Sequence, residues 1–284
     1  SQQGTEVVHG GVTAISRETF ELITNSFNNV PEGFTVHKKL QKLLQQRVEM
    51  GKSGKVNWGM GELLALGSVL LEGTNVRMSG QDVHDHLPDQ EWSPLQNLAA
   101  EQGTLRIYNS LLSEYGVMGF EYGYSVERPD SLVVWEAQFG DFANGAQTII
   151  DEFVSSSEQK WGQRSSLVLL LPHGYEGQGP DHSSARIERY LQLCAENNMT
   201  VAVPSTPASY FHLLRRHSQH RPYKPLVVIS PKQLLRLKSA TSSIEAFTEG
   251  SFQPVIGDRS GVNPAEVERL VLVSGRLYYD LEAE

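Results

Sequence analysis

The sequence predicts an α/β fold, a mostly parallel sheet with helices on both faces. Short apolar runs alternate along the chain with longer runs of helical periodicity, and this alternation is typical of a parallel sheet covered on both sides. Two of the short runs, 131–135 (SLVVW) and 166–172 (SLVLLLP), are apolar without a polar residue at every second position. Strands that are buried on both faces have this pattern.

The individual elements follow from the same periodicities. We expect strands at 75–82, 131–135, 166–172, 199–204 and 225–230, and helices at 19–27, 35–50, 58–73, 147–161, 183–195 and 208–217. The second helix is basic and amphipathic, which indicates either a solvated face or a partner or membrane-surface helix. The third is almost entirely apolar, and its one inner charge, Glu62, lies near the helix start where a cavity could adjoin it.

Composition narrows the class of protein. The chain has 284 residues with 24 Lys and Arg against 33 Asp and Glu, and this net charge of −9 argues against nucleic acid as the main partner. No apolar run approaches the roughly 20 residues of a membrane helix. Cys194 is the one cysteine, which fits a reducing compartment and excludes an internal disulfide framework. It falls on an apolar helix face, so we expect a buried side chain.

The stretch 108–147 is the centre of the functional prediction. It begins with a helical run in which Gly116, Gly119 and Gly123 recur along one side. Each glycine costs a helix roughly 1 kcal/mol relative to alanine, so the close approach of another backbone or of a flat ligand is expected there. Glu114 lies near the helix start. It is either a solvated first-turn carboxylate or a functional group.

Polar residues follow three of the expected strands. Because parallel strands end at the same edge of a sheet, and ligands gather at that edge, these residues are site candidates. The polar candidates are Gln81, Asp82, Glu136, Gln138 and His173, and the aromatic Phe139 lies among them in the sequence.

Several common site types are disfavoured. No GxSxG or GxGxxG motif is present, and GKSGK at 51–55 lacks P-loop spacing. His84, Asp85 and His86 have no fourth partner, so they indicate a metal site only weakly. His182 belongs to a glycine-rich loop with His173, and it is either one of a catalytic histidine pair or a cap of the next helix.

Several long strings are distinctive: WGMGELLALGSVLLEG, SGQD, LSEYGVMGFEYGYS, LVVWEAQFGDFANGAQTIIDEF and PHGYEGQGPDHSSAR. They resemble the first component of 2-oxoglutarate dehydrogenase, a thiamine diphosphate-dependent decarboxylase. The resemblance implies a transketolase-like, pyrimidine-binding α/β domain. Its expected divisions are a lead-in at 1–50, that domain at 51–237, a linker at 238–265 and the start of a C-terminal domain at 266–284. The run VERLVLVSGRLYYDL looks like a strand–loop–helix unit of this last domain, so we expect a longer protein.

The resemblance also implies residue roles. Glu114 matches the glutamate that hydrogen-bonds a ring nitrogen of the aminopyrimidine, and Phe139 matches the aromatic residue that packs on that ring. His173 and His182 match histidines that line the reaction centre. The remaining cofactor-binding residues implied are Glu136, Gln138, Gln81 and Asp82.

The implied reaction is oxidative decarboxylation of 2-oxoglutarate, with succinyl transfer to a lipoyl group. The implied partners are a second copy, in a homodimer with the active site at its interface, and the dihydrolipoyl succinyltransferase component with its lipoyl domain. Neither a nucleic acid nor a membrane is expected. The implied location is the bacterial cytoplasm or the mitochondrial matrix.

Two departures from the family pattern stand out. A segment of the type RGTFxHRH that follows SGQD in the family is missing here. The GDG motif that holds magnesium is also absent, so the Mg²⁺ ligands are expected outside this chain. The alternatives are a 2-oxoadipate dehydrogenase or a non-catalytic regulatory or assembly fragment. For the latter, Arg215, Arg216 and His217 form a basic helix end that faces either an anionic effector or water.

Overall fold

The sheet is the centre of the molecule. The computed structural model describes residues 11–81, 92–220, 222–258 and 261–284. Within them lies one six-stranded sheet in the order β2-β1-β3-β4-β6-β5, and every neighbouring pair of strands is parallel. This confirms the predicted fold class. The strands are β1 (Asn75–Gly80), β2 (Leu105–Asn109), β3 (Ser131–Glu136), β4 (Val168–Pro172), β5 (Thr200–Ala202) and β6 (Leu226–Ser230).

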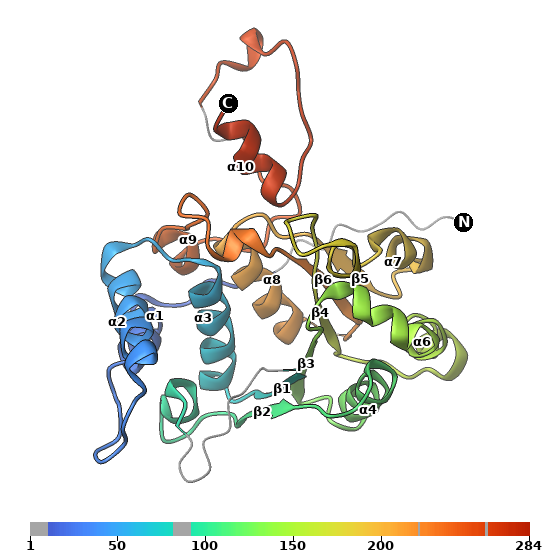
Figure 1. Cartoon of the computed structure of the whole chain (residues 1–284), viewed down its shortest axis with the longest axis horizontal. Helices are drawn as coiled ribbons and strands as arrows, with labels where there is room; N and C mark the ends of the chain where they lie inside the picture. Colours follow the sequence, from blue (N-terminus) through green and yellow to red (C-terminus); the bar gives the residue numbers. More distant parts are fainter. Residues whose placement is uncertain (1–10, 82–91, 221, 259–260) are drawn as a thin grey trace.

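Helices cover both faces of the sheet (Figure 1). Along β3, Leu132 and Val134 belong to one core cluster, while Val133 and Trp135 belong to the other, and so the strand reads as a continuous apolar run. The first core is completed by α1 (Arg17–Ser26), α2 (Lys38–Ser53), α3 (Trp58–Leu71), α8 (Pro207–Gln219) and α9 (Glu245–Thr248). The second is completed by α4 (Glu114–Glu127), α5 (Gln147–Ile149) and α7 (Ile187–Leu193).

Several boundaries differ from the predictions. The expected helix at 147–161 is divided into α5, a π-helical turn at Ile150–Val154 and α6 (Ser157–Trp161). The expected helix at 183–195 begins only at Ile187, because Arg186 before it has a left-handed backbone with φ of 54°. Strand β2 was not predicted. It is an edge strand with one buried face, so its sequence alternates instead of being continuously apolar.

The C-terminal segment is also corrected. The predicted strand within 267–273 does not form, since those residues have no strand partner among the described residues and Leu270 and Leu272 are largely exposed. The predicted helix does form, as α10 (Arg276–Glu282), which lies above the rest of the fold in Figure 1. The expected linker contributes Ala240, Ile244 and Phe247 to the first core.

Two predictions about the exposure of side chains near the helix ends were wrong. Cys194 is exposed, because α7 ends at Leu193 and its apolar face does not continue. Arg215 does not face water, since it is only 2% exposed. Its guanidinium donates to the Thr13 carbonyl at 2.6 Å and to Glu72 Oε1 at 2.6 Å, so it joins the N-terminal segment, α3 and α8.

Candidate functional site

The carboxyl ends of the parallel strands bring the predicted site residues together. Gly80 at the end of β1 is in register with Asn109 of β2 and with Glu136 of β3. In the same way Pro172 of β4 is in register with Ser230 of β6. The residues that follow these strands therefore lie along one edge of the sheet, where ligands of α/β proteins bind.

A small pocket lies at this edge. Four of the predicted residues line it together: Gln81, Glu114, Glu136 and Gln138. Its other walls are Gly80, Ser110, Leu112, Val117 and Trp135. The enclosed space is about 10 Å³, about that of one water molecule. The pocket, called here the polar pocket, is thus a narrow notch.

Glu114 is the first residue of α4. The helix begins here because the Ser113 hydroxyl caps it, accepting a hydrogen bond from the Gly116 amide at 3.4 Å. The side chain is half-buried, and the turn at 140–146 packs beside it. A Cβ added at Gly145 would lie 3.6 Å from Glu114 Oε2, so the turn approaches the carboxyl closely.

The carboxyl of Glu136 in this pocket has a strongly raised pKa. Its burial, and then the negative charge of Glu62 on α3, raise its pKa to about 8. Glu62 accepts a hydrogen bond of 2.6 Å from the hydroxyl of Tyr210 on α8. Burial also raises the pKa of Glu62, which the Tyr210 hydrogen bond and the charge of Arg47 partly offset. At neutral pH Glu136 therefore carries its proton and can donate a hydrogen bond into the pocket.

The sequence suggested that Glu62 adjoins a cavity; in the structure its side chain is partly buried and is not among the residues that line this pocket. Sequence reasoning missed Tyr210. Its ring stacks on Trp58 with centroids 4.9 Å apart, so its hydroxyl is held against α3. A tyrosine on the buried face of an amphipathic helix was the available signal, because a buried hydroxyl needs a partner.

His173 and His182 belong to the loop at residues 173–182, called here the histidine loop. The His173 amide donates to the Ser230 carbonyl at 2.9 Å, and its ring Nδ1 accepts from the Ala185 amide at 3.0 Å. Desolvation and then the charge of Lys232 lower the pKa of His173, so its imidazole is neutral at pH 7.

His182 does not cap the following helix. Helix α7 begins at Ile187 and has no side-chain cap, so that reading was wrong. Instead the His182 ring stands edge-on to Phe139, with centroids 4.4 Å apart and planes at 85°, and also contacts Phe142 at 5.5 Å.

Phe139 lies between the residues of the polar pocket and those of the histidine loop. It is absent from the walls of the polar pocket and lies against His182 instead. Because Gln138 lines the pocket and Phe139 is the next residue, the turn after β3 joins the pocket to the histidine loop. Lys232, which sequence reasoning missed, lies 5.4 Å from the centre of the Phe139 ring. It follows β6, so the same search of strand ends would have found it.

Some predicted residues lie outside the described part of the chain, namely Asp82 and the cluster His84, Asp85 and His86. Within the described residues, no group of three or more His, Cys, Asp or Glu side chains could hold a metal ion. Also within that part, no helix has both the length and the apolar character needed to cross a membrane.

Comparison with known proteins decides the family. Residues 54–238 match the model of the transketolase pyrimidine-binding domain. The chain belongs to the transketolase pyrimidine-binding domain family. Residues 241–284 match the model described as 2-oxoglutarate dehydrogenase C-terminal. The resemblance inferred from the sequence strings is thereby confirmed.

Individual relatives of this pyrimidine-binding domain are much longer. The chain is 54% identical over 289 residues to a Corynebacterium glutamicum protein named 2-oxoglutarate dehydrogenase E1/E2 component, covering 96% of this chain and 24% of that protein. It is 51% identical over 298 residues to the multifunctional 2-oxoglutarate metabolism enzyme of Mycobacterium sp. (strain JLS), covering 95% of this chain and 23% of that one. The chain thus spans about a quarter of these relatives.

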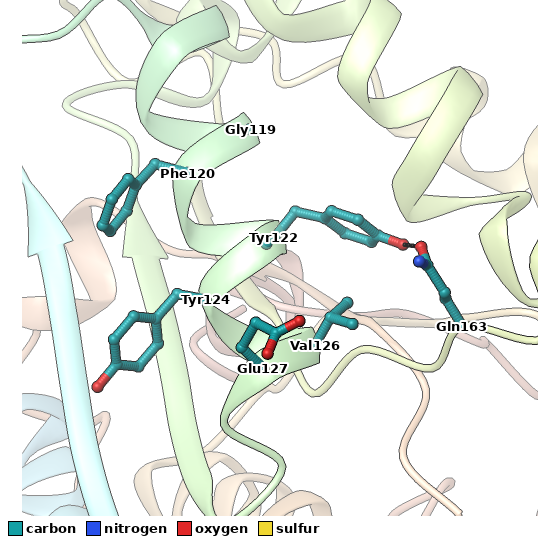
Figure 2. A pocket seen from close by; sticks show the side chains of 8 residues that line it. Gly119, Phe120, Tyr122, Tyr124, Val126, Glu127 and Gln163 are labelled. Carbon is teal, nitrogen blue, oxygen red and sulfur yellow. Dashed lines mark hydrogen bonds between the residues drawn. The ribbon is translucent and has the colours of Figure 1, made fainter.

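A second, larger pocket of about 530 Å³ lies on α4, and Figure 2 shows it. Gly119 and Gly123 are among its lining residues. In Figure 2 the Tyr122 ring lies on one side of α4, and the Phe120 and Tyr124 rings lie on the other. An added Cβ at Gly119 would meet only a side chain, at 3.5 Å, and one at Gly123 would meet nothing within 4 Å. No backbone of the described residues therefore makes the close approach that was expected at Gly119 and Gly123.

An ion pair fixes one wall of this larger pocket on α4, called from here on the α4 groove. The Arg77 guanidinium donates to both oxygens of Glu121, at 2.7 and 2.9 Å, and Glu121 is only 1% exposed. The same guanidinium lies 4.3 to 5.1 Å from the ring centres of Tyr108, Phe120 and Tyr124. Cation–π contacts and a bidentate ion pair together hold these rings in place.

The state of Glu136 predicts a pH-dependent stability. Its pKa is about 8 in the fold and 4.5 as an ordinary carboxyl, so the folded state binds more protons between these values. The free energy of unfolding should therefore fall as the pH rises from 5 to 9. Glu136→Gln keeps the hydrogen-bonding shape but cannot ionise.

We expect the melting temperature of Glu136→Gln, relative to wild type, to rise steadily over that pH range. Glu101→Gln, at an exposed glutamate, is the control and should show no such trend. A difference between Glu136→Gln and wild type that is the same at pH 5 and pH 9 would show that Glu136 ionises normally.

Proposed function

We propose that this chain forms part of a thiamine diphosphate-dependent 2-oxoglutarate dehydrogenase. In this proposal the whole protein decarboxylates 2-oxoglutarate and passes the succinyl unit to a lipoyl group of a second component. The observation that carries the proposal is the meeting of Glu114, Glu136, Gln138 and Gln81 in one pocket at the carboxyl edge of the sheet. The names of the relatives support the choice of substrate.

The polar pocket offers the kinds of group that the edge of an aminopyrimidine would bind. Such an edge presents both donors and acceptors, and the pocket offers amide groups, the Glu114 carboxyl and the protonated Glu136. When bound, thiamine diphosphate supplies an electron sink for the carbon that loses carbon dioxide. The described residues contain no cluster for the magnesium ion of a diphosphate, so its ligands are assigned to another part of the protein.

Each residue then has a role. Glu114 hydrogen-bonds a ring nitrogen and holds or releases the proton at that atom. Glu136 donates a hydrogen bond to the ring edge, and Phe139 packs against its face. His173 is neutral, so it can accept a proton during the reaction. His182, fixed beside Phe139, faces the same edge of the sheet.

The α4 groove is the proposed docking surface of a second copy. Three large side chains of α4 and the loop before it are about half exposed or more, namely Leu112, Tyr115 and Phe120. The polar pocket also includes Leu112 and Glu114, so one helix serves both pockets. A second copy over this helix would cover the glycines and close the polar pocket, which supports an active site shared between two subunits.

Glu114→Gln tests the cofactor role. In the full-length protein we expect the rate of 2-oxoglutarate decarboxylation to fall by roughly 100-fold or more, because glutamine cannot hold or release the proton at the ring nitrogen. Glu18→Gln is the matched control, since Glu18 also lies in the first turn of a serine-capped helix, α1, away from the pocket. Turnover by Glu114→Gln equal to that of Glu18→Gln would refute the assignment.

His182→Ala tests the histidine loop. We expect turnover to fall by ~100-fold or more, the usual scale for the loss of an acid–base group. Turnover and melting temperature are measured together on the full-length protein. A lowered melting temperature with normal turnover would restrict His182 to supporting Phe139.

Gly123→Leu tests the docking surface. A Cβ at Gly123 would meet nothing within 4 Å outside the helix's own backbone, and leucine favours a helix by roughly 1 kcal/mol over glycine. The variant should therefore fold at least as stably while its side chain blocks the groove. We expect the dissociation constant of the dimer, measured by analytical ultracentrifugation, to rise at least ~10-fold. Gly123→Ala, with a smaller side chain, is the control. Unchanged self-association of Gly123→Leu would remove this surface from the dimer.

A further inference from the structure

Lys232 has an unusual set of partners. It follows β6, and among the described residues no aspartate or glutamate forms an ion pair with it. Its ammonium donates instead to the main-chain carbonyl of Gly174 at 2.8 Å and to that of His182. A third contact reaches Gln178 Oε1 at 3.5 Å. One side chain thus joins the beginning, the middle and the end of the histidine loop.

The next residue adds a second attachment. The Gln233 amide donates to Glu176 Oε2 at 2.7 Å, and its side-chain Nε2 donates to the Glu176 carbonyl at 3.3 Å. Lys232 and Gln233 therefore hold the loop at several successive points. All of these bonds link the end of β6 to the loop that follows β4, the neighbouring strand of the sheet.

The histidine loop needs such attachments. Gly174, Gly177 and Gly179 have φ values of 134°, 93° and 84°, conformations that other residues rarely adopt. Ordering each residue costs about 1–2 kcal/mol of conformational entropy, and glycine loses the most. The loop also has little apolar anchoring, since Tyr175 is 83% exposed. Hydrogen bonds from outside the loop therefore add to its internal bond, from the His182 amide to the Gly179 carbonyl at 3.4 Å, and to the packing of His182 on Phe139.

We propose that Lys232 is a positioning residue that, together with Gln233, fixes the histidine loop so that His182 keeps its place beside Phe139 and His173 its place beside the end of β6. The catalytic value of those places rests on the proposed function, whereas the fixing of the loop does not. The lysine is half-buried and its three contacts are all with uncharged oxygens, so its positive charge stays close to the histidines.

This charge also acts on His173. The charged groups that face His173 are Lys232, from the segment after β6, and three acids, Asp141, Glu176 and Glu188. Desolvation lowers the pKa of the imidazole most, and the charge of Lys232 lowers it further, whereas the three acids raise it. Removing the lysine charge should therefore raise the pKa of His173.

The test uses the full-length protein with Lys232→Met, Lys232→Gln and Lys232→Arg. Lys160→Met is the matched control, because Lys160 also lies 5.4 Å from an aromatic ring centre, that of Trp161, and donates to a carbonyl, that of Glu152. Chymotrypsin cleavage after Tyr175 measures the opening of the loop. Acylation by diethyl pyrocarbonate, resolved by peptide mass spectrometry across pH, measures the pKa of each histidine.

We expect Lys232→Met and Lys232→Gln to be cleaved after Tyr175 at least ~10-fold faster than wild type, since charge-assisted hydrogen bonds to two carbonyls are lost. The pKa of His173 should rise in both variants and return toward the wild-type value in Lys232→Arg. Turnover should fall by roughly 10- to 100-fold through misplacement of the histidines. Lys160→Met should match wild type in all three measurements.

Wild-type cleavage and an unchanged His173 pKa in a folded Lys232→Gln protein would overturn the proposal. If Lys232→Met does not fold, the comparison of Lys232→Gln with Lys232→Arg decides the same question. Absence of 2-oxoglutarate decarboxylation by the wild type would refute the proposed function alone, because the cleavage and acylation measurements do not depend on activity.

Discussion

The parallel hydrogen bonding of β1, β3, β4 and β6 is the constraint on which the rest of the structure depends. Main-chain bonds fix the register of these strands, so their carboxyl ends align whatever side chains follow. The short turns after them then bring carboxyl, amide, imidazole and ammonium groups together from distant parts of the sequence. A shift of one residue in β3 would move Glu136 from the pocket and reverse the two core faces of the strand.

The helices that cover the sheet determine the chemistry of that edge. Helix α3 approaches α8 closely, as a Cβ at Gly61 would lie 3.0 Å from the Pro207 carbonyl. This approach places the Tyr210 hydroxyl within hydrogen-bonding distance of Glu62. The buried Glu62 then acts on Glu136, whose proton is retained at neutral pH. Core packing on one face of the sheet thus controls the ionisation of a group at its edge.

Helix α4 has two separate tasks. Its first residue places Glu114 in the polar pocket, and its glycines further along leave a groove between aromatic walls. If a second copy occupies the groove, assembly and cofactor binding depend on the same helix. The histidine loop stands on the other side of the β3 turn, where Lys232 and Gln233 hold it. The site therefore consists of the end of β3 between the start of α4 and the histidine loop.

The sequence by itself determined the fold class, most of the strands and helices, and the gathering of Gln81, Glu136 and His173 at strand ends. It could do so because hydrophobic periodicity records how each segment is buried, and parallel strands share an edge. Only the tertiary structure decided that Glu136 is the protonated carboxyl, that Arg215 is buried, and that Lys232 holds the histidine loop. Ionisation and hydrogen bonding depend on what packing brings together: burial and the charge of Glu62 for Glu136, Thr13 and Glu72 for Arg215. Local sequence carries no record of those neighbours.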